Sequence, residues 1–63
     1  MNITVHGKGT IEFPEGTTAE DVVKKLGFHK DAVIVLQDDV PIPIDKPMEE
    51  GVNIKIIHVV SGG

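Results

Sequence analysis

The sequence predicts an α+β fold in which a mixed sheet of four to five strands has one helix packed across it. Two observations support this. Apolar residues alternate with polar ones near the start of the chain, and one later stretch has helical spacing. The chain has 63 residues, which is enough for one domain. Hydrophobic residues make up 40% of it, so a small apolar core can form.

Residues 1–6 and 10–13 each alternate between apolar and polar side chains, as half-buried strands do. In the first of these segments, Ile3 and Val5 share one face. The intervening segment 6–9 contains two glycines, which adopt positive φ at little cost and favour a tight turn. We therefore expect a β-hairpin at the start of the chain.

A short helix follows the hairpin. Thr18 is a good N-cap, and Asp21 stands three residues later in a capping-box position, although Thr17 with Glu20 is an equally acceptable register. Gly27 is expected to end the helix. The apolar residues between these points recur at i, i+3, i+4 and i+7 and form one stripe, made of Ala19, Val22, Val23 and Leu26.

Two strands are expected after the helix. Residues 32–36 are apolar and largely β-branched, which indicates a buried strand, and a polar turn follows at 37–39. Residues 40–44 are extended but contain Pro41 and Pro43. Since proline cannot donate a ladder hydrogen bond, this strand belongs at a sheet edge.

Residues 52–60 form the longest strand candidate, with Ile54 and Ile56 expected to face the core. The first and last strands are the most continuous, so we expect them to lie together at the centre of the sheet. Together with a single helix on one face, this order predicts a roll of the ubiquitin or β-grasp kind. We expect residues 1–60 to form this domain and residues 61–63 to form a flexible tail.

Composition excludes several classes of function. The chain has a net charge of −4 and six lysines that form no run, which disfavours nucleic acid as a partner. No apolar stretch approaches the length of a membrane span, so a membrane is not an expected partner. No secretion signal is seen either, and the cytoplasm is therefore the expected compartment. The chain has no cysteine, so no thiolate can act as a nucleophile or metal ligand.

The whole chain resembles a family of small ubiquitin-like sulfur carriers. It is most similar to the thiamine-biosynthesis carriers, and more distantly to the small subunit of molybdopterin synthase and to archaeal ubiquitin-like modifiers. Four segments carry the resemblance, and the terminal glycine pair is the most specific of them. They are Gly16-Thr17-Thr18 with Val22-Val23 and Leu26, the strand Ala32-Val33-Ile34-Val35 with Val40-Pro41, the turn Glu50-Gly51-Val52-Asn53-Ile54, and the end Val59-Val60-Ser61-Gly62-Gly63.

The resemblance implies that the chain is a carrier rather than an enzyme, and that it binds no cofactor or metal. An E1-like adenylating enzyme would consume ATP to activate the carboxylate of Gly63. A persulfide sulfur donor would then leave a thiocarboxylate, which passes sulfur to a synthase such as thiazole synthase. Ser61 and Gly62 would be recognised with Gly63, because small residues let the backbone enter a narrow catalytic slot.

Alternatives to the sulfur carrier remain open. A lysine amine could attack the activated Gly63 instead, which makes the chain a protein modifier. The chain could also be a small subunit of molybdopterin synthase, whose tail enters a larger partner. A different class is a β-grasp interaction module without covalent chemistry, for which loss of Gly62 and Gly63 would be harmless.

The last strand also suggests a docking surface for the partner. If Ile54 and Ile56 face the core, Ile57 either breaks the alternation or points outward, and Val59 follows it. Exposed aliphatic side chains beside the tail, with Val60 leading into it, would suit docking on an activating enzyme. The alternative is a β-bulge that returns Ile57 and Val59 to the core.

Other polar residues are expected to have structural or solvent-exposed roles. The spacing of His6, His29 and His58 matches no metal-ligand motif. The acidic pairs Asp38-Asp39 and Glu49-Glu50 fall in expected turns, where solvated charges are the default.

Overall fold

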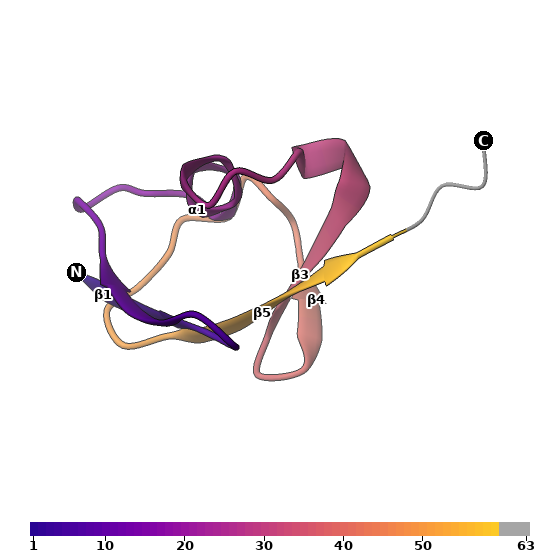
Figure 1. The fold of residues 1–63 in the computed structure, drawn as a ribbon. Helices are drawn as coiled ribbons and strands as arrows, with labels where there is room; N and C mark the ends of the chain where they lie inside the picture. Colours follow the sequence, from indigo (N-terminus) through magenta and orange to yellow (C-terminus); the bar gives the residue numbers. More distant parts are fainter. Residues whose placement is uncertain (60–63) are drawn as a thin grey trace.

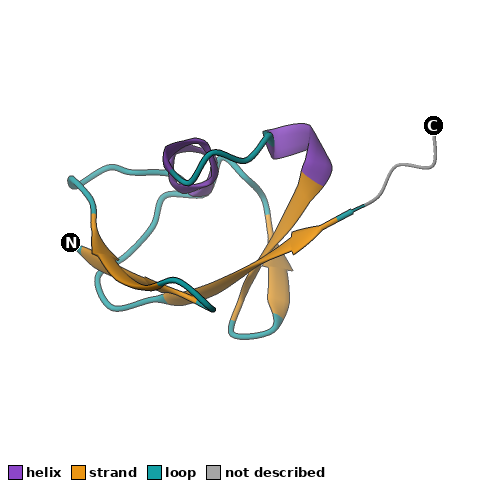
Figure 2. Cartoon of the chain, in the orientation of Figure 1, coloured by secondary structure: helices purple, strands orange, loops and turns teal. Residues whose placement is uncertain are grey.

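A computed structural model describes residues 1–59 as one five-stranded sheet with a helix lying across one face (Figures 1 and 2). The strand order is β2-β1-β5-β3-β4. The elements, in chain order, are β1 (Asn2–Val5), β2 (Gly9–Glu12), α1 (Ala19–Lys25), the 3-10 turn η1 (Lys30–Ala32), β3 (Val33–Gln37), β4 (Val40–Ile42) and β5 (Asn53–His58). This confirms the predicted β-grasp architecture. No helix within the described residues is long and apolar enough to cross a membrane.

The first and last strands lie side by side, as predicted. β1 and β5 run parallel, and Thr4 pairs with Asn53 while Val5 pairs with Ile54. The backbone N–H groups of Thr4 and His6 donate to the carbonyl oxygens of Val52 and Ile54, both at 2.9 Å. β1 also pairs antiparallel with β2, which completes the expected hairpin. β1 and β5 are shorter than the alternating pattern suggested, and β2 has the predicted length but begins one residue earlier.

The C-terminal half of the sheet differs from the prediction mainly at its boundaries. A short 3-10 turn precedes β3, so the strand begins at Val33 rather than residue 32. One turn is too short to leave a periodic signal in the sequence. β4 lies at the sheet edge, as its prolines require, but ends at Ile42 and not at residue 44.

β4 ends early because the loop that follows it supplies carbonyl acceptors to the first N–H groups of the helix. The N–H groups of Glu20 and Ala19 donate to the carbonyl oxygens of Ile44 at 2.7 Å and Lys46 at 3.0 Å. The first N–H groups of a helix have no partner within it. The loop after β4 therefore attaches to the helix instead of continuing along the sheet.

The helix begins with the capping box that the sequence predicts. The N–H of Asp21 donates to Thr18 Oγ1 at 3.3 Å, and the N–H of Thr18 donates to Asp21 Oδ2 at 3.1 Å. This selects Thr18 over the alternative start at Thr17, whose hydroxyl instead donates to the carbonyl of Pro14. Gly27 follows the helix at φ +85°, where a side chain would be strained.

We expect Thr18→Ala to destabilise the domain by about 1 kcal/mol, because the N–H of Asp21 loses its acceptor. In a domain this small, that lowers Tm by roughly 4–8 °C. Thermal unfolding followed by circular dichroism checks the prediction. Asp21→Ala should cost a similar amount, and the double variant should cost less than the sum. Strict additivity would show that the two hydrogen bonds are not one coupled unit.

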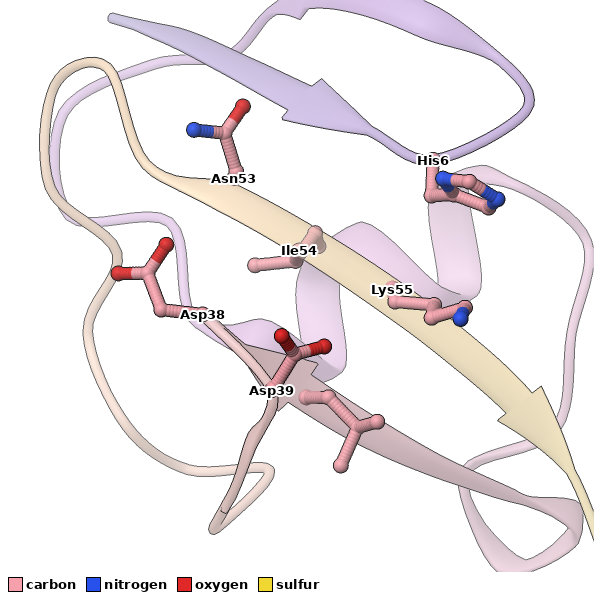
Figure 3. A pocket seen from close by; sticks show the side chains of 7 residues that line it. His6, Asp38, Asp39, Asn53, Ile54 and Lys55 are labelled. Carbon is pink, nitrogen blue, oxygen red and sulfur yellow. The ribbon is translucent and has the colours of Figure 1, made fainter.

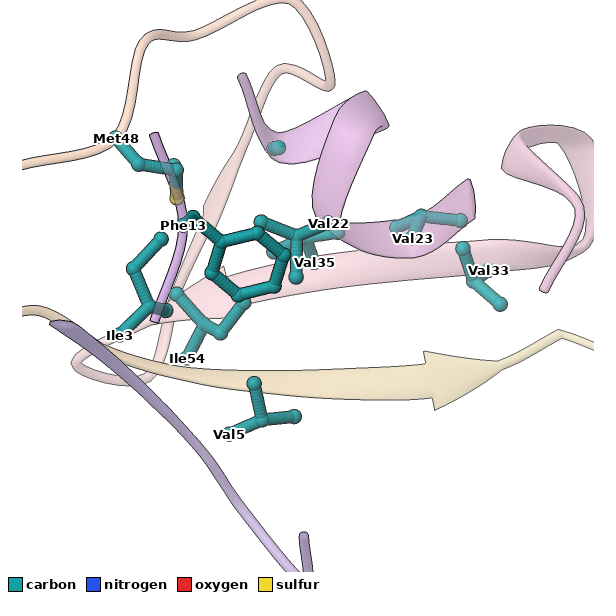
Figure 4. Close-up of a cluster of buried hydrophobic side chains, with 10 residues drawn as sticks. Ile3, Val5, Phe13, Val22, Val23, Val33, Val35, Met48 and Ile54 are labelled. Carbon is teal, nitrogen blue, oxygen red and sulfur yellow. The ribbon is translucent and has the colours of Figure 1, made fainter. Parts of the chain in front are cut away.

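The core fills the space between the helix and the sheet (Figure 4). Its aliphatic side chains come from the inward faces of the three central strands and from α1, with Phe13 and Met48 closing one end. Ile54 is buried and Ile56 is partly buried against the cluster, as predicted for the last strand. The fully enclosed side chains are Ile3, Val5, Val22, Val23 and Val35.

Candidate functional site

The candidate site begins where the last strand approaches the C-terminus. β5 pairs antiparallel with β3 in one uninterrupted register, from Gln37 opposite Ile54 to Val33 opposite His58. The N–H of Val59 then donates to the carbonyl of Ala32 at 2.9 Å, which continues the same register. The chain is therefore held against the sheet as far as Val59. A bulge, the alternative considered for this strand, is not present in this ladder.

The regular register directs Ile57 and Val59 outward, to the face opposite the helix. Their exposed fractions are 37% and 41%. Ile57 does not break the alternation, since Ile54 and Ile56 face the core and Lys55 and Ile57 face away. The predicted docking residues of β5 that the structure describes thus lie on one surface beside the tail.

Ile34 extends this surface, although the sequence analysis did not single it out. It lies directly opposite Ile57 on β3 and is 41% exposed. Leu36, two residues along β3, is half-buried on the same face. The strand reads as continuously apolar, which hides its alternation. Alternation would have indicated an outward Ile34, because this residue lies between Val33 and Val35, which are both buried. We call Ile34, Leu36, Ile57 and Val59 the outer apolar patch.

An aromatic contact on the helix side supports the end of β5. The His58 ring meets Phe28 edge to face, with centroids 4.7 Å apart and planes at 76°. Lys8 Nζ lies 5.5 Å from the centroid of the Phe28 ring, within cation–π range. This contact and the Val59–Ala32 hydrogen bond hold the end of β5 against the rest of the domain.

The residues expected to carry the chemistry lie outside the described part of the chain. These are Gly63, with Gly62 and Ser61 as its recognition residues, and Val60 at the start of the tail. Covalent geometry still limits their reach. Four extended residues span at most about 14 Å, so Gly63 lies within about that distance of Val59.

A pocket lies at the other end of the same face (Figure 3). It encloses about 330 Å³. The β5 residues Asn53, Ile54 and Lys55 lie between His6 on the β1 side and Leu36, Asp38 and Asp39 on the β3–β4 side. It joins the outer apolar patch through Leu36.

Three of the polar residues singled out in the sequence, His6, Asp38 and Asp39, line this pocket together. In residues 1–59, no group of three or more His, Asp or Glu side chains is close enough to hold a metal ion. Glu49 and Glu50 are both exposed, as expected for solvated charges. The two carboxylate oxygens of Glu50 also accept from the N–H of Asn2, both at 3.1 Å, and so tie the start of β1 to the turn before β5.

Comparison with known proteins shows which family the chain belongs to. Residues 1–60 match the model of the family described as small archaeal modifier protein 2. The chain belongs to this family. A relative from Archaeoglobus fulgidus, described only as an uncharacterized protein, is 33% identical over 48 residues, which are 76% of this chain and 70% of the relative.

Membership of the small archaeal modifier family confirms the coarser part of the sequence interpretation. The chain is a protein of the ubiquitin-like modifier or carrier kind. Particular closeness to the thiamine-biosynthesis carriers is not part of this finding. The family match ends at residue 60, so Ser61, Gly62 and Gly63 stay a prediction from the sequence.

Proposed function

We propose that this chain is a ubiquitin-like modifier whose Gly63 carboxylate is activated by an E1-like enzyme and joined to lysine amines of other proteins. The observation that carries the proposal is membership of a family of small modifiers in a chain that ends in Gly-Gly. The uninterrupted β5 ladder supports it, because the ladder holds the chain against the sheet up to Val59, the residue directly before 60–63.

The activation step needs no catalytic group from the chain itself. A Gly63 carboxylate oxygen attacks the α-phosphate of ATP on the partner enzyme, an acyl-adenylate forms and pyrophosphate leaves. A lysine amine then attacks the acyl carbon, loses a proton and displaces AMP, which gives an isopeptide bond. The chain is a co-substrate in this sequence, and recognition of its folded body by the enzyme places Gly63 for reaction.

The outer apolar patch is the docking surface in this proposal. Ile57 and Val59 lie directly before the tail, and Ile34 widens the patch onto β3. Exposed aliphatic side chains that adjoin each other are a common mark of a protein interface. An enzyme bound there has the Gly63 carboxylate within about 14 Å of Val59.

A second candidate is sulfur transfer, which uses the same activation. A persulfide sulfur of the donor replaces the lysine amine, attacks the acyl carbon and displaces AMP, which gives an acyl disulfide. A thiol of the partner enzyme then attacks the donor's sulfur and breaks the S–S bond, which leaves a thiocarboxylate at Gly63 and a disulfide on the donor. The resemblance to thiamine-biosynthesis carriers favours this role, with a synthase such as thiazole synthase as acceptor. The absence of cysteine is also compatible with it, because no side-chain thiol competes for the sulfur.

Analysis of the products by mass spectrometry separates the two roles. The last lysine is Lys55, so trypsin leaves residues 56–63 attached to any modified lysine. In cells that express the chain, we expect branched peptides carrying this remnant, absent when Gly62 and Gly63 are deleted. Exchange of one terminal oxygen for sulfur without branched peptides would instead establish the carrier. If neither product forms, the chain is a non-covalent interaction module.

A further inference from the structure

The outer face of the sheet has two chemically different ends. Along β5 and the residue that follows it, the outward positions are Asn53, Lys55, Ile57 and Val59, so the face is polar where the strand begins and apolar where it approaches the tail. On β3, the aliphatic Ile34 lies opposite Ile57 and the aliphatic Leu36 opposite Lys55, and the acidic turn 38–39 follows the strand at the polar end of the face. A partner that covers this face can therefore dock in only one favourable direction.

The pocket at the polar end has unbalanced charge. Asp38 and Asp39 contribute two carboxylates on one side and Lys55 one ammonium, while His6 is formally neutral (Figure 3). Among the described residues, the ion pair within 4.0 Å is Glu20–Lys24, on the helix, and neither aspartate takes part in one. One additional cationic group in this pocket would balance its charge.

The turn that carries the two aspartates is not built for stability. Asp38 and Asp39 are the central residues of a two-residue hairpin loop, with φ values of +52° and +68°. Such a loop prefers Asn-Gly, because both positions lie in the left-handed region. The two carboxylates are thus held next to the outer apolar patch at a cost in backbone strain.

We propose that the enzyme segment covering the outer apolar patch carries a lysine or arginine side chain at its far end, and that this side chain enters the pocket beside Asp38 and Asp39. The inference rests on the proposed function, and names the chemistry of the partner's contact surface. Aliphatic side chains of the segment meet Ile34 and Ile57, and its cation sets the direction in which the segment lies. The tail then emerges at the apolar end, toward the active site.

Charge argues against a second copy of the chain as the occupant. Each copy has a net charge of −4, and its outer face has two unpaired aspartates. Two such surfaces would repel each other, whereas a basic segment is attracted to the acidic turn. The partner is therefore expected to present positive charge where the chain presents Asp38 and Asp39.

The double variant Asp38→Asn/Asp39→Gly separates binding from folding. It installs the pair that this turn prefers, so Tm is expected to stay the same or rise. The control Asp31→Asn/Asp45→Asn also removes two negative charges, but from exposed positions outside the pocket. Both variants are compared with the wild-type chain in ATP–pyrophosphate exchange by the E1-like enzyme of the same cell, over a range of salt concentrations.

We expect the turn variant to raise the KM for the chain about fivefold at low salt, the factor expected for two exposed ion pairs. The difference should vanish near 1 M salt, where the Debye length is about 3 Å, and the control variant should behave as wild type.

Equal KM values for turn variant and wild type would overturn the inference and leave the proposed function intact. A salt-dependent dimer of the chain that the turn variant abolishes would also overturn it. If the wild-type chain supports no exchange, the proposed function fails and the inference fails with it.

Discussion

Deleting Gly62 and Gly63 is expected to reduce ATP–pyrophosphate exchange by more than about 100-fold. Misplacing a reacting group by 1 Å can already cost about 100-fold, and two residues span up to about 7 Å of chain. The carboxylate of the shortened chain would not reach the α-phosphate of ATP. Exchange by the purified E1-like enzyme, measured against chain concentration, checks this prediction.

The folded domain should be unaffected by the same deletion. Every residue of the described core cluster lies at or before Ile56, so Tm should agree with that of the wild-type chain. Gly63→Ala should show a smaller loss of exchange, because the added methyl group restricts the backbone in the slot. Ser61→Ala is the matched control and should retain exchange. Comparable exchange by the deletion and wild-type chains would remove the tail from the mechanism.

Ile57→Asp is expected to weaken binding to the activating enzyme by about 10- to 30-fold, because a charge would replace a central apolar contact of the interface. The domain should itself lose about 1–2 kcal/mol, because Asp gives up the partial burial of an Ile that is 37% exposed and has a poor strand propensity. Affinity measured by calorimetry with the enzyme, together with the Tm of each variant, checks both parts.

Val40→Asp is the matched control for this prediction. Val40 is 60% exposed and lies directly opposite Gln37. Gln37 is on the helix side of the sheet, as the alternation of β3 shows, so Val40 is on that side too. The same charge introduced there should leave enzyme affinity close to that of wild type. If the Val40 and Ile57 variants bind equally well, the outer apolar patch is not the docking surface.

Local sequence signals predicted most of the fold because they agree with the tertiary structure. Thr18 and Asp21 form the capping box that their spacing indicates, and Gly27 adopts the left-handed conformation expected after a helix. The two prolines near β4 indicated an edge strand. Its early end was not visible, since it depends on hydrogen bonds from the helix to Ile44 and Lys46.

The candidate site was predictable only in part. The positions of Ile57 and Val59 followed from alternation, but alternation alone could not decide between an exposed strand and a bulge. Ile34 was missed because β3 is almost entirely apolar, so the sequence does not show which of its side chains face outward. The hydrogen bonds of Glu50 could not be predicted, since its partner, the N–H of Asn2, is 48 residues away in sequence.

The central claim, that Gly63 is activated as an acyl group, is tested most directly by trapping the activated end with hydroxylamine. The chain is incubated with ATP, the E1-like enzyme and hydroxylamine, whose nitrogen attacks the activated carbonyl and displaces the leaving group. We predict a hydroxamate at Gly63, found in the tryptic peptide 56–63 and absent without ATP, whichever acceptor operates in the cell. An unmodified terminal peptide, with an enzyme that converts a control substrate, would contradict the claim.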